Sequence, residues 1–466
     1  MRRKKRKKRR MINNSAEITI DNKTLFEKLG RIALPIAIQG VVSGTLGLID
    51  TIMVGFLGEA ELAAVGIATQ IYFIHYLFLF GFTSGASTFV AQFYGTQDMK
   101  NIRKVIGFAM TVAFGVGILF FIMAFFFTKQ ILGIYSDDPA IIAMAVPYVK
   151  IGTVTFFFLA ISSPMEMAFK ATQQTRIPMM ISIVVFSTNT FLNYVLIFGK
   201  FGAPELGIEG AAIATATARF IEVTLSLVVG CRHGGFAGPI KEFFQWNRDL
   251  LLRIIKNALP TTGNELFWSI GTSLYVAAFS RIGTTAYASF QAAQSINSIF
   301  SFAAFSIGDA TLILVGEKLG EGNKEYAYAL GKKLLKVGTI FGVLFGLLVV
   351  ACAYPMIHLF ALSELGKSYG FKILVVYGLT MGLNLYDGIN ITGILRGGGD
   401  TRFAMFAEVG CIWCVAVPLA FSAALWWHLP IYLAVLCVRG NDLVEAVILT
   451  RRFFSKKWLN TVITGL

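Results

Sequence analysis

Apolar runs of membrane-spanning length recur along almost the whole chain, separated by polar or glycine-rich breaks. A helix that crosses a bilayer needs about 20 apolar residues, because lipid offers its backbone no hydrogen-bond partners. The pattern therefore predicts an all-α integral membrane protein with twelve transmembrane helices, several long enough to tilt or kink. We expect them at 32–56, 62–93, 105–127, 140–169, 178–198, 207–230, 254–279, 286–315, 334–358, 370–395, 403–426 and 430–450.

Composition supports this class. Of the 466 residues, 56% are hydrophobic and only 14% are charged, whereas soluble domains have about 25% charged residues. The five cysteines are an odd number, which argues against a disulfide framework. Cys411 and Cys414 lie inside an apolar run without a second Cys or His pair, so we interpret them as small packing residues.

The net charge of +15 arises from Lys and Arg residues whose positions along the chain indicate which side of the membrane each loop occupies. Nine basic residues occupy positions 2–10, and we expect this segment to bind anionic lipids and not nucleic acid. With twelve helices, 33 of the 41 Lys and Arg residues lie on the side of the termini and 6 on the other. The positive-inside rule places both termini in the cytoplasm. No signal peptide is expected, because polar residues 13–24 follow the basic run; Met11 is an alternative start.

The two halves of the chain repeat. Ala33-Leu34-Pro35 recurs as Ala258-Leu259-Pro260, and Gly58 and Gly95 recur as Gly283 and Gly320. Six helices per half return the chain to its starting side, which predicts two six-helix bundles related by a pseudo-two-fold axis along the membrane normal. We expect a basic cytoplasmic N-terminal tail (1–31), an N-terminal lobe (32–230), a cytoplasmic linker (231–253), a C-terminal lobe (254–450) and a cytoplasmic C-terminal tail (451–466).

Several motifs, in order from about residue 25 to 450, resemble those of one family. They are Ile49-Asp50-Thr51-Ile52-Met53-Val54-Gly55, Ala91-Gln92-Phe93-Tyr94-Gly95, Leu192-Asn193-Tyr194-Val195, Gly207-Ile208-Glu209-Gly210 and Gly393-Ile394-Leu395-Arg396-Gly397-Gly398-Gly399-Asp400-Thr401. On these residues the chain is similar to the MATE (multidrug and toxic compound extrusion) transporters of the bacterial type. The loop after the second helix, Gly95-Thr96-Gln97-Asp98-Met99-Lys100, does not match the major facilitators.

The resemblance implies a V-shaped pair of lobes and an antiporter, driven by Na⁺ or H⁺, that exports lipophilic, often cationic drugs. It implies no enzyme activity, no cofactor beyond the coupling ion, a monomer and a place in a bacterial or archaeal inner membrane. A flippase for lipid-linked sugars is the alternative, but only Arg219 and Arg439 lie inside predicted helices to bind pyrophosphate. A membrane enzyme such as a prenyltransferase is more remote, because the paired acids Asp137-Asp138 lie in a predicted external loop.

Candidate coupling residues in the first half centre on Asp50, which has no basic residue within a helical turn. A charge deep in lipid costs about 2.5–3.5 kcal/mol, so it needs a partner, an aqueous cavity or a function. Asn189 and Asn193 present two amide oxygens on one face of the fifth helix. The resemblance implies that these three residues, with Thr215, form a cation or proton site. Asn193 stands where some relatives have Asp, which leaves one charge fewer here.

In the second half, the resemblance implies a coupling role for Glu265 in the seventh helix. The repeat places Gly40 at the equivalent position of the first half, so this acid belongs to one lobe only. Asp387 in the tenth helix is its expected partner, although it stands closer to Arg396 than the family's acid usually does. Asp309 in the eighth helix is a secondary candidate that matches no family motif.

The remaining intramembrane charges are expected to be structural. Arg219 and Glu222, and likewise Arg439 and Asp442, stand three residues apart and can neutralise each other on one helix face. Glu166 lies near Lys170 at the end of its helix, where we expect it to belong to the membrane interface.

Overall fold

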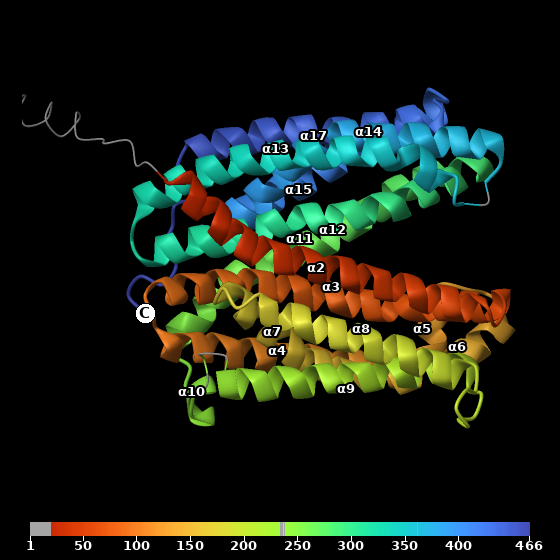
Figure 1. The fold of residues 1–466 in the computed structure, drawn as a ribbon, viewed down its shortest axis with the longest axis horizontal. Helices are drawn as coiled ribbons and strands as arrows, with labels where there is room; N and C mark the ends of the chain where they lie inside the picture. The colour runs from red at the N-terminus through yellow and green to blue at the C-terminus, as the bar shows by residue number, and fades with distance from the viewer. Residues whose placement is uncertain (1–19, 234–235, 237, 361) are drawn as a thin grey trace, which may run out of the picture.

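The computed structural model describes residues 20–233, 236, 238–360 and 362–466, and its regular secondary structure is helical throughout this part. Figure 1 shows the helices running side by side in two bundles. The N-terminal bundle contains α2 (Asn22–Gly55), α3 (Glu59–Gly95), α4 (Met99–Phe126), α5 (Thr128–Leu132), α6 (Pro139–Gly152), α7 (Thr155–Ala171), α8 (Arg176–Ile197) and α9 (Gly207–His233). A short helix, α10 (Ile240–Phe243), leads to the second bundle.

The C-terminal bundle includes π-helical stretches as well as α-helices. It contains α11 (Arg248–Ser280), α12 (Thr284–Gly320), α13 (Lys324–Ile357), α14 (Glu364–Gly388) with η1 (Ile389–Leu395), α15 (Thr401–Cys411), η2 (Ile412–Ala416), α16 (Val417–Phe421), η3 (Ser422–Trp426) and α17 (Ile431–Phe454). The fold is therefore all-α, and each of the twelve predicted ranges lies in a helix or a bent helical stretch.

Length and apolar composition alone do not single out all of these helices as membrane spans. Within the described residues, eight helices meet both conditions, and α6 with α7, bent by 49°, would make a ninth. Helices α11, α14 and α17 fall short because polar and charged residues interrupt them; α17, for example, contains Arg439, Asp442 and Glu445. Many of these polar side chains are buried between helices, so the bundle shields them from lipid.

The helices also continue past the apolar ranges. Helix α2 begins at Asn22, well before the predicted start at residue 32, because Asp21 caps it. The Asp21 carboxylate accepts from the backbone N–H and the hydroxyl of Thr24 at 3.0 and 2.6 Å. These hydrogen bonds hold the pKa of Asp21 below its ordinary value. An N-cap satisfies the helix end in water, so the helix needs no apolar residues there.

The repeat is visible as a symmetric contact between α3 and α12. Both helices end at the predicted repeat glycines, Gly95 and Gly320. A Cβ at Gly95 would collide with the carbonyl oxygen of Glu317, and a Cβ at Gly320 would collide with that of Gln92. Each glycine thus permits the same close backbone approach from opposite sides, as a pseudo-two-fold axis between the bundles requires.

The bundles meet at one end of the molecule and diverge towards the other, giving the V shape (Figure 1). We call the meeting end the tail end, because residues 455–466, the tail, lie there. Buried hydrogen bonds join the bundles: Asn257 Nδ2 donates to the Gly85 carbonyl at 2.8 Å, and the Thr261 hydroxyl donates to the Gly81 carbonyl at 2.6 Å. These bonds, with the α3–α12 contact, form what we call the seam.

The tail lies across the seam and contacts both bundles. Trp458 is fully buried. Gln92 of α3 donates to the carbonyls of Gly397 and Asn460 at 3.2 and 3.1 Å, and its Oε1 accepts from the Val462 backbone N–H at 2.8 Å. On the C-terminal bundle, Arg253 donates to the Val462 carbonyl at 3.2 Å. The tail therefore closes the tail end of the molecule.

Replacing Gln92 by Ala is expected to loosen this closure. The change leaves the Gly397 carbonyl and the Val462 N–H without their partners, which costs about 1–3 kcal/mol in the closed arrangement. Hydrogen exchange at the Val462 amide should accelerate about 5–150-fold, the factor that corresponds to this cost. Gln130→Ala, at an exposed position of α5, is the control and should leave this rate unchanged. Equal protection in both variants would show that Gln92 does not hold the tail.

Candidate functional site

Four of the predicted residues come together in the N-terminal bundle. Asn193 donates from Nδ2 to Asp50 Oδ1 at 2.6 Å and to Asn189 Oδ1 at 3.0 Å. Asn189 in turn donates to the hydroxyl of Thr215 at 3.2 Å. The chain of hydrogen bonds joins α2, α8 and α9, and we call it the Asp50 network.

The Asp50 network is largely buried, but some of its oxygen atoms remain available to a ligand. Asn189 and Asn193 are both 1% exposed, and the Oδ1 atom of Asn193 has no hydrogen-bond partner in the part of the chain that the structure describes. Within the described residues, Asp50 forms no ion pair; Arg219, on α9, pairs with Glu222 at 2.6 Å instead. A carboxylate, amide oxygens and a hydroxyl are the groups that bind a hard cation or exchange a proton.

Glu265 occupies a different environment in the C-terminal bundle. Its carboxylate forms an ion pair with Arg396 at 2.7 Å, and Arg396 also donates to the hydroxyl of Ser84 at 2.9 Å. Ser84 belongs to α3, so this contact crosses between the bundles. Arg396 directly follows the predicted span 370–395, and its side chain is 3% exposed where it pairs with Glu265.

Asp387 is not brought together with Glu265 by any interaction that the structure shows in the described residues. It lies at the end of α14, just before the π-helical η1, and is 4% exposed. Neither carboxylate oxygen has a hydrogen-bond partner there. Its electrostatic neighbours are Glu445, Asp442 and Glu408. The expected Glu265–Asp387 pair is thus replaced by a Glu265–Arg396 pair and a separate buried acid.

Asp309 of α12 is half-buried and faces charges of both bundles. Lys170 and Arg396 are its cationic neighbours, and Glu166 and Glu265 its acidic ones. Glu166 pairs with Lys170 at 2.6 Å and accepts from Gln39 Nε2 of α2 at 2.8 Å.

The other predicted charge pairs form as expected. Arg219 pairs with Glu222, and Arg439 lies 3.5 Å from Asp442. These pairs neutralise charge on single helix faces of α9 and α17.

Two acids inside predicted spans, the half-buried Glu408 and the buried Glu445, were not singled out from the sequence. Glu408 of α15 accepts from Asn264 Nδ2 at 2.7 Å. Glu445 of α17 is 5% exposed, and one of its oxygens has no partner. Glu408 is the single acid in the predicted span 403–426, which is the same signal that singled out Asp50, and applying it throughout would have found this residue. Glu445 shares the span 430–450 with Arg439 and Asp442, so its signal was weaker. In the part of the chain described, no three His, Cys, Asp or Glu side chains converge on a metal site.

Comparison with known proteins agrees with this architecture. The MatE family model matches residues 35–195 and 260–422, one match in each bundle and together more than half of the chain. The chain belongs to the MatE family. Similar family members include a probable multidrug resistance protein NorM of Thermotoga maritima, 25% identical over 447 residues that cover 93% of each chain. The multidrug resistance protein MdtK of Pectobacterium atrosepticum is 24% identical over 413 residues, covering 86% of this chain and 88% of MdtK.

Solved MATE structures share the fold. An outward-facing multidrug resistance MATE family transporter of the MOP superfamily superposes with a TM-score of 0.82 at 19% identity, over 95% of this chain and all of the other. A MOP superfamily transporter from Pyrococcus furiosus gives the same TM-score, identity and coverage. At this identity the likeness concerns the fold alone, and it confirms the two-bundle membrane architecture.

Proposed function

We propose that this chain is an antiporter that exports lipophilic, often cationic compounds by alternating access, driven by Na⁺ or H⁺. The observation that carries the proposal is the Asp50 network, where an acid without an ion-pair partner meets the buried amides of Asn193 and Asn189. A structural acid in lipid would be neutralised by a basic side chain, as Glu222 and Glu166 are. The names of the family relatives, multidrug resistance proteins, support the substrate class.

Coupling follows from competition for the same oxygens. Cation or proton binding at Asp50 removes the negative charge that attracts a cationic substrate, so loading of one favours release of the other. The driving ion can shift the conformational equilibrium only through different affinities for the two states. Asp50 lies on α2, whose Gly40 and Gly44 pack against Phe302 of α12 in the other bundle, so a change at Asp50 acts on a helix that joins the two.

The closed tail end supports an assignment of the conformation. We place the tail end in the cytoplasm, as the Lys and Arg distribution favours. The bundles then diverge towards the outside, the arrangement expected of an outward-open state. Arg396 bridges Glu265 to Ser84 across the bundles, and inward opening would have to break this link.

The proposed division of the chain into domains follows its two bundles. The lobes comprise residues 32–230 and 254–450, joined by the cytoplasmic segment 231–253 and flanked by cytoplasmic segments 1–31 and 451–466. Asp387 is a second candidate for ion coupling. Glu265 and Asp309, which lie nearer the other lobe than Asp387 does, belong to the same set of candidates. We place a monomer in a bacterial or archaeal inner membrane. The basic segment 2–10, assigned to anionic lipids, lies outside the described residues.

The test is efflux from proteoliposomes that contain the full chain and a fluorescent lipophilic cation such as ethidium. A Na⁺ gradient at constant pH and a pH gradient in Na⁺-free buffer are imposed separately. We expect at least one gradient to accelerate dye movement over protein-free liposomes, and the effective gradient identifies the coupling ion. Dye movement that responds to neither gradient would overturn the antiporter assignment.

A further inference from the structure

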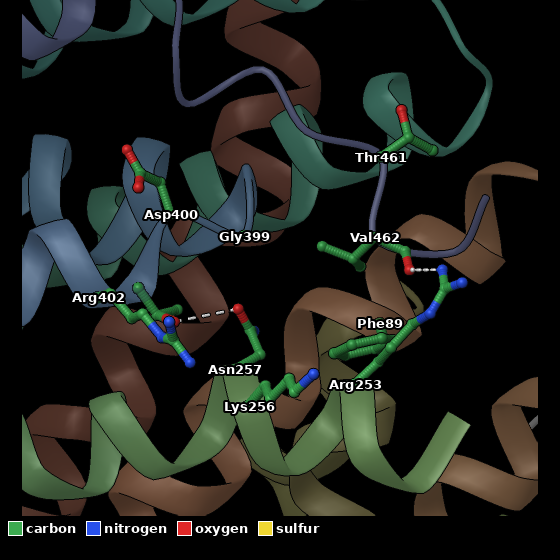
Figure 2. Close-up of a pocket in the computed structure, with 10 residues that line it drawn as sticks. Phe89, Arg253, Lys256, Asn257, Gly399, Asp400, Arg402, Thr461 and Val462 are labelled. Carbon is green, nitrogen blue, oxygen red and sulfur yellow. Dashed lines mark hydrogen bonds between the residues drawn. The ribbon is translucent and has the colours of Figure 1, made fainter. Parts of the chain in front are cut away.

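A cavity of about 450 Å³ lies at the tail end, beside the seam (Figure 2). Four parts of the chain line it: Phe89 of α3; Arg253, Lys256 and Asn257 of α11; residues 399–402 at the start of α15; and Thr461 with Val462 of the tail. Its volume falls within the range of about 300–1,000 Å³ typical of small-ligand sites. The Asp50 network contributes nothing to its walls, so it is separate from the proposed coupling site.

The walls of this cavity carry more basic than acidic side chains. Arg253, Lys256 and Arg402 line it, and Asp400 is the only acid among the lining residues. Both Asp400 oxygens are held by Arg452, at 2.6 and 2.9 Å. In Figure 2 the Asp400 carboxylate points away from Lys256 and Arg402. The negative charge of Asp400 is therefore neutralised by Arg452 and does not balance the positive charges of Lys256 and Arg402.

The three basic side chains differ in how many hydrogen bonds and ion pairs they form within the protein. Arg253 forms an ion pair with Asp249 at 3.7 Å and donates to the carbonyls of Val462 and Thr464, at 3.2 and 2.7 Å. Lys256 and Arg402 are exposed side chains, and neither forms an ion pair with any residue of the described ranges. In Figure 2, Arg402 and Lys256 lie to either side of Asn257. Two unpaired cations that share one concave site repel each other unless an anion lies between them.

We infer that this cavity binds a phosphate-bearing anion between Lys256 and Arg402. A guanidinium offers a planar pair of donors that matches two phosphate oxygens, and an ammonium adds a mobile point charge. On the face that we assign to the cytoplasm, the phosphate could belong to the headgroup of an anionic lipid or to a soluble phosphorylated compound. Both share the chemistry that the cavity recognises.

Because of the position of the cavity, binding of the anion affects whether the tail end is open or closed. Its walls include α3 of the N-terminal bundle, α11 of the C-terminal bundle and the tail, so a ligand inside it contacts all three parts of the closed seam. A ligand that binds the closed form better than the open form stabilises the closed form. Occupancy therefore favours the closed tail end, and opening requires the anion to leave.

Binding is tested on the purified full chain with two probes. Inorganic pyrophosphate is titrated calorimetrically in detergent, and thermal stability is compared in phosphatidylcholine nanodiscs with and without phosphatidylglycerol. We expect at least one probe to bind, and Lys256→Gln combined with Arg402→Gln to weaken that binding about tenfold, because charge-assisted bonds to phosphate are removed. A response to pyrophosphate alone identifies a soluble ligand, and a response to phosphatidylglycerol alone identifies a lipid.

A matched control separates a built site from diffuse surface charge. Lys332 and Lys336 on α13 are exposed, and Lys332→Gln with Lys336→Gln removes the same net charge away from the cavity. This control should bind the effective probe as the unmodified chain does. An equal loss in both double variants, no loss in either, or no binding of either probe would overturn the site.

The link to the seam has its own readout, which does not depend on transport. Hydrogen exchange at the Val462 amide, bonded to Gln92, should slow when the effective probe is bound. Binding without any change in this rate would show that the anion does not stabilise the seam. Because neither measurement uses an ion gradient, failure of the antiporter proposal leaves both results interpretable.

Discussion

Replacing Asp50 by Asn is expected to abolish gradient-driven efflux while the protein remains folded and inserted. The new amide oxygen can still accept from Asn193, which now donates to Asp50 at 2.6 Å, so the packing of α2 against α8 is kept. The change removes the only group of the Asp50 network that can bind a proton, together with its negative charge. Coupling free energies of about 1–3 kcal/mol correspond to a loss of about 5–150-fold in the gradient-dependent response.

The measurement is the initial rate of dye efflux from proteoliposomes with and without the effective gradient. Asp137→Asn, at an exposed position between α5 and α6, removes the same charge elsewhere and should retain the full response. Asn193→Ala provides a second arm: it removes the hydrogen-bond donor to Asp50 but leaves the carboxylate, so ion dependence should shift while coupling persists. Undiminished, gradient-driven efflux by the Asp50→Asn protein would contradict the assigned role.

Replacing Arg396 by Gln is expected to cause the largest loss of stability. Arg396 is 3% exposed and neutralises Glu265, whose side chain is 13% exposed, at 2.7 Å. Removing one partner of a buried ion pair leaves an uncompensated charge and typically costs about 3–5 kcal/mol. The hydroxyl of Ser84 also loses the donor that connects it to the other bundle. The melting temperature of the protein in detergent should fall accordingly.

A double variant tests the cause of this loss. Combining Arg396→Gln with Glu265→Gln removes both charges, so much of the lost stability should return if the unpaired carboxylate is responsible. Arg451→Gln, at an exposed position of α17, controls for the loss of an arginine and should melt like the unmodified protein. A double variant that is as unstable as Arg396→Gln alone would show that the guanidinium acts through other contacts.

The sequence predicted those parts of the fold that depend on local pattern or on the repeat. Apolar runs located the helices, and the repeat glycines Gly95 and Gly320 mark the symmetric contact of α3 with α12. Asn189 and Asn193 stand one helical turn apart, so their shared face follows from helix geometry alone. Their contact with Asp50, far away in the chain, was available only through the family resemblance.

Long-range pairing could not be predicted in the same way. The apolar range 370–395 ends just before Arg396, so local hydropathy did not indicate that its side chain is buried against Glu265, 131 residues away. Glu408 is likewise paired with Asn264, 144 residues away. The extent of α2 beyond the apolar range depended on the Asp21 cap, which is a signal at the water-exposed end and not in lipid.

The tail has a consequence for the order in which the molecule is completed. Residues 455–466 are synthesised after both bundles, yet Asn460 and Val462 bond to Gln92, which is made early. Domains and helices form from the N-terminus during synthesis, so both bundles are in the membrane before Trp458 can reach its buried position. The contact that closes the tail end is thus absent while the two bundles are being made and becomes available only after the tail itself has been synthesised.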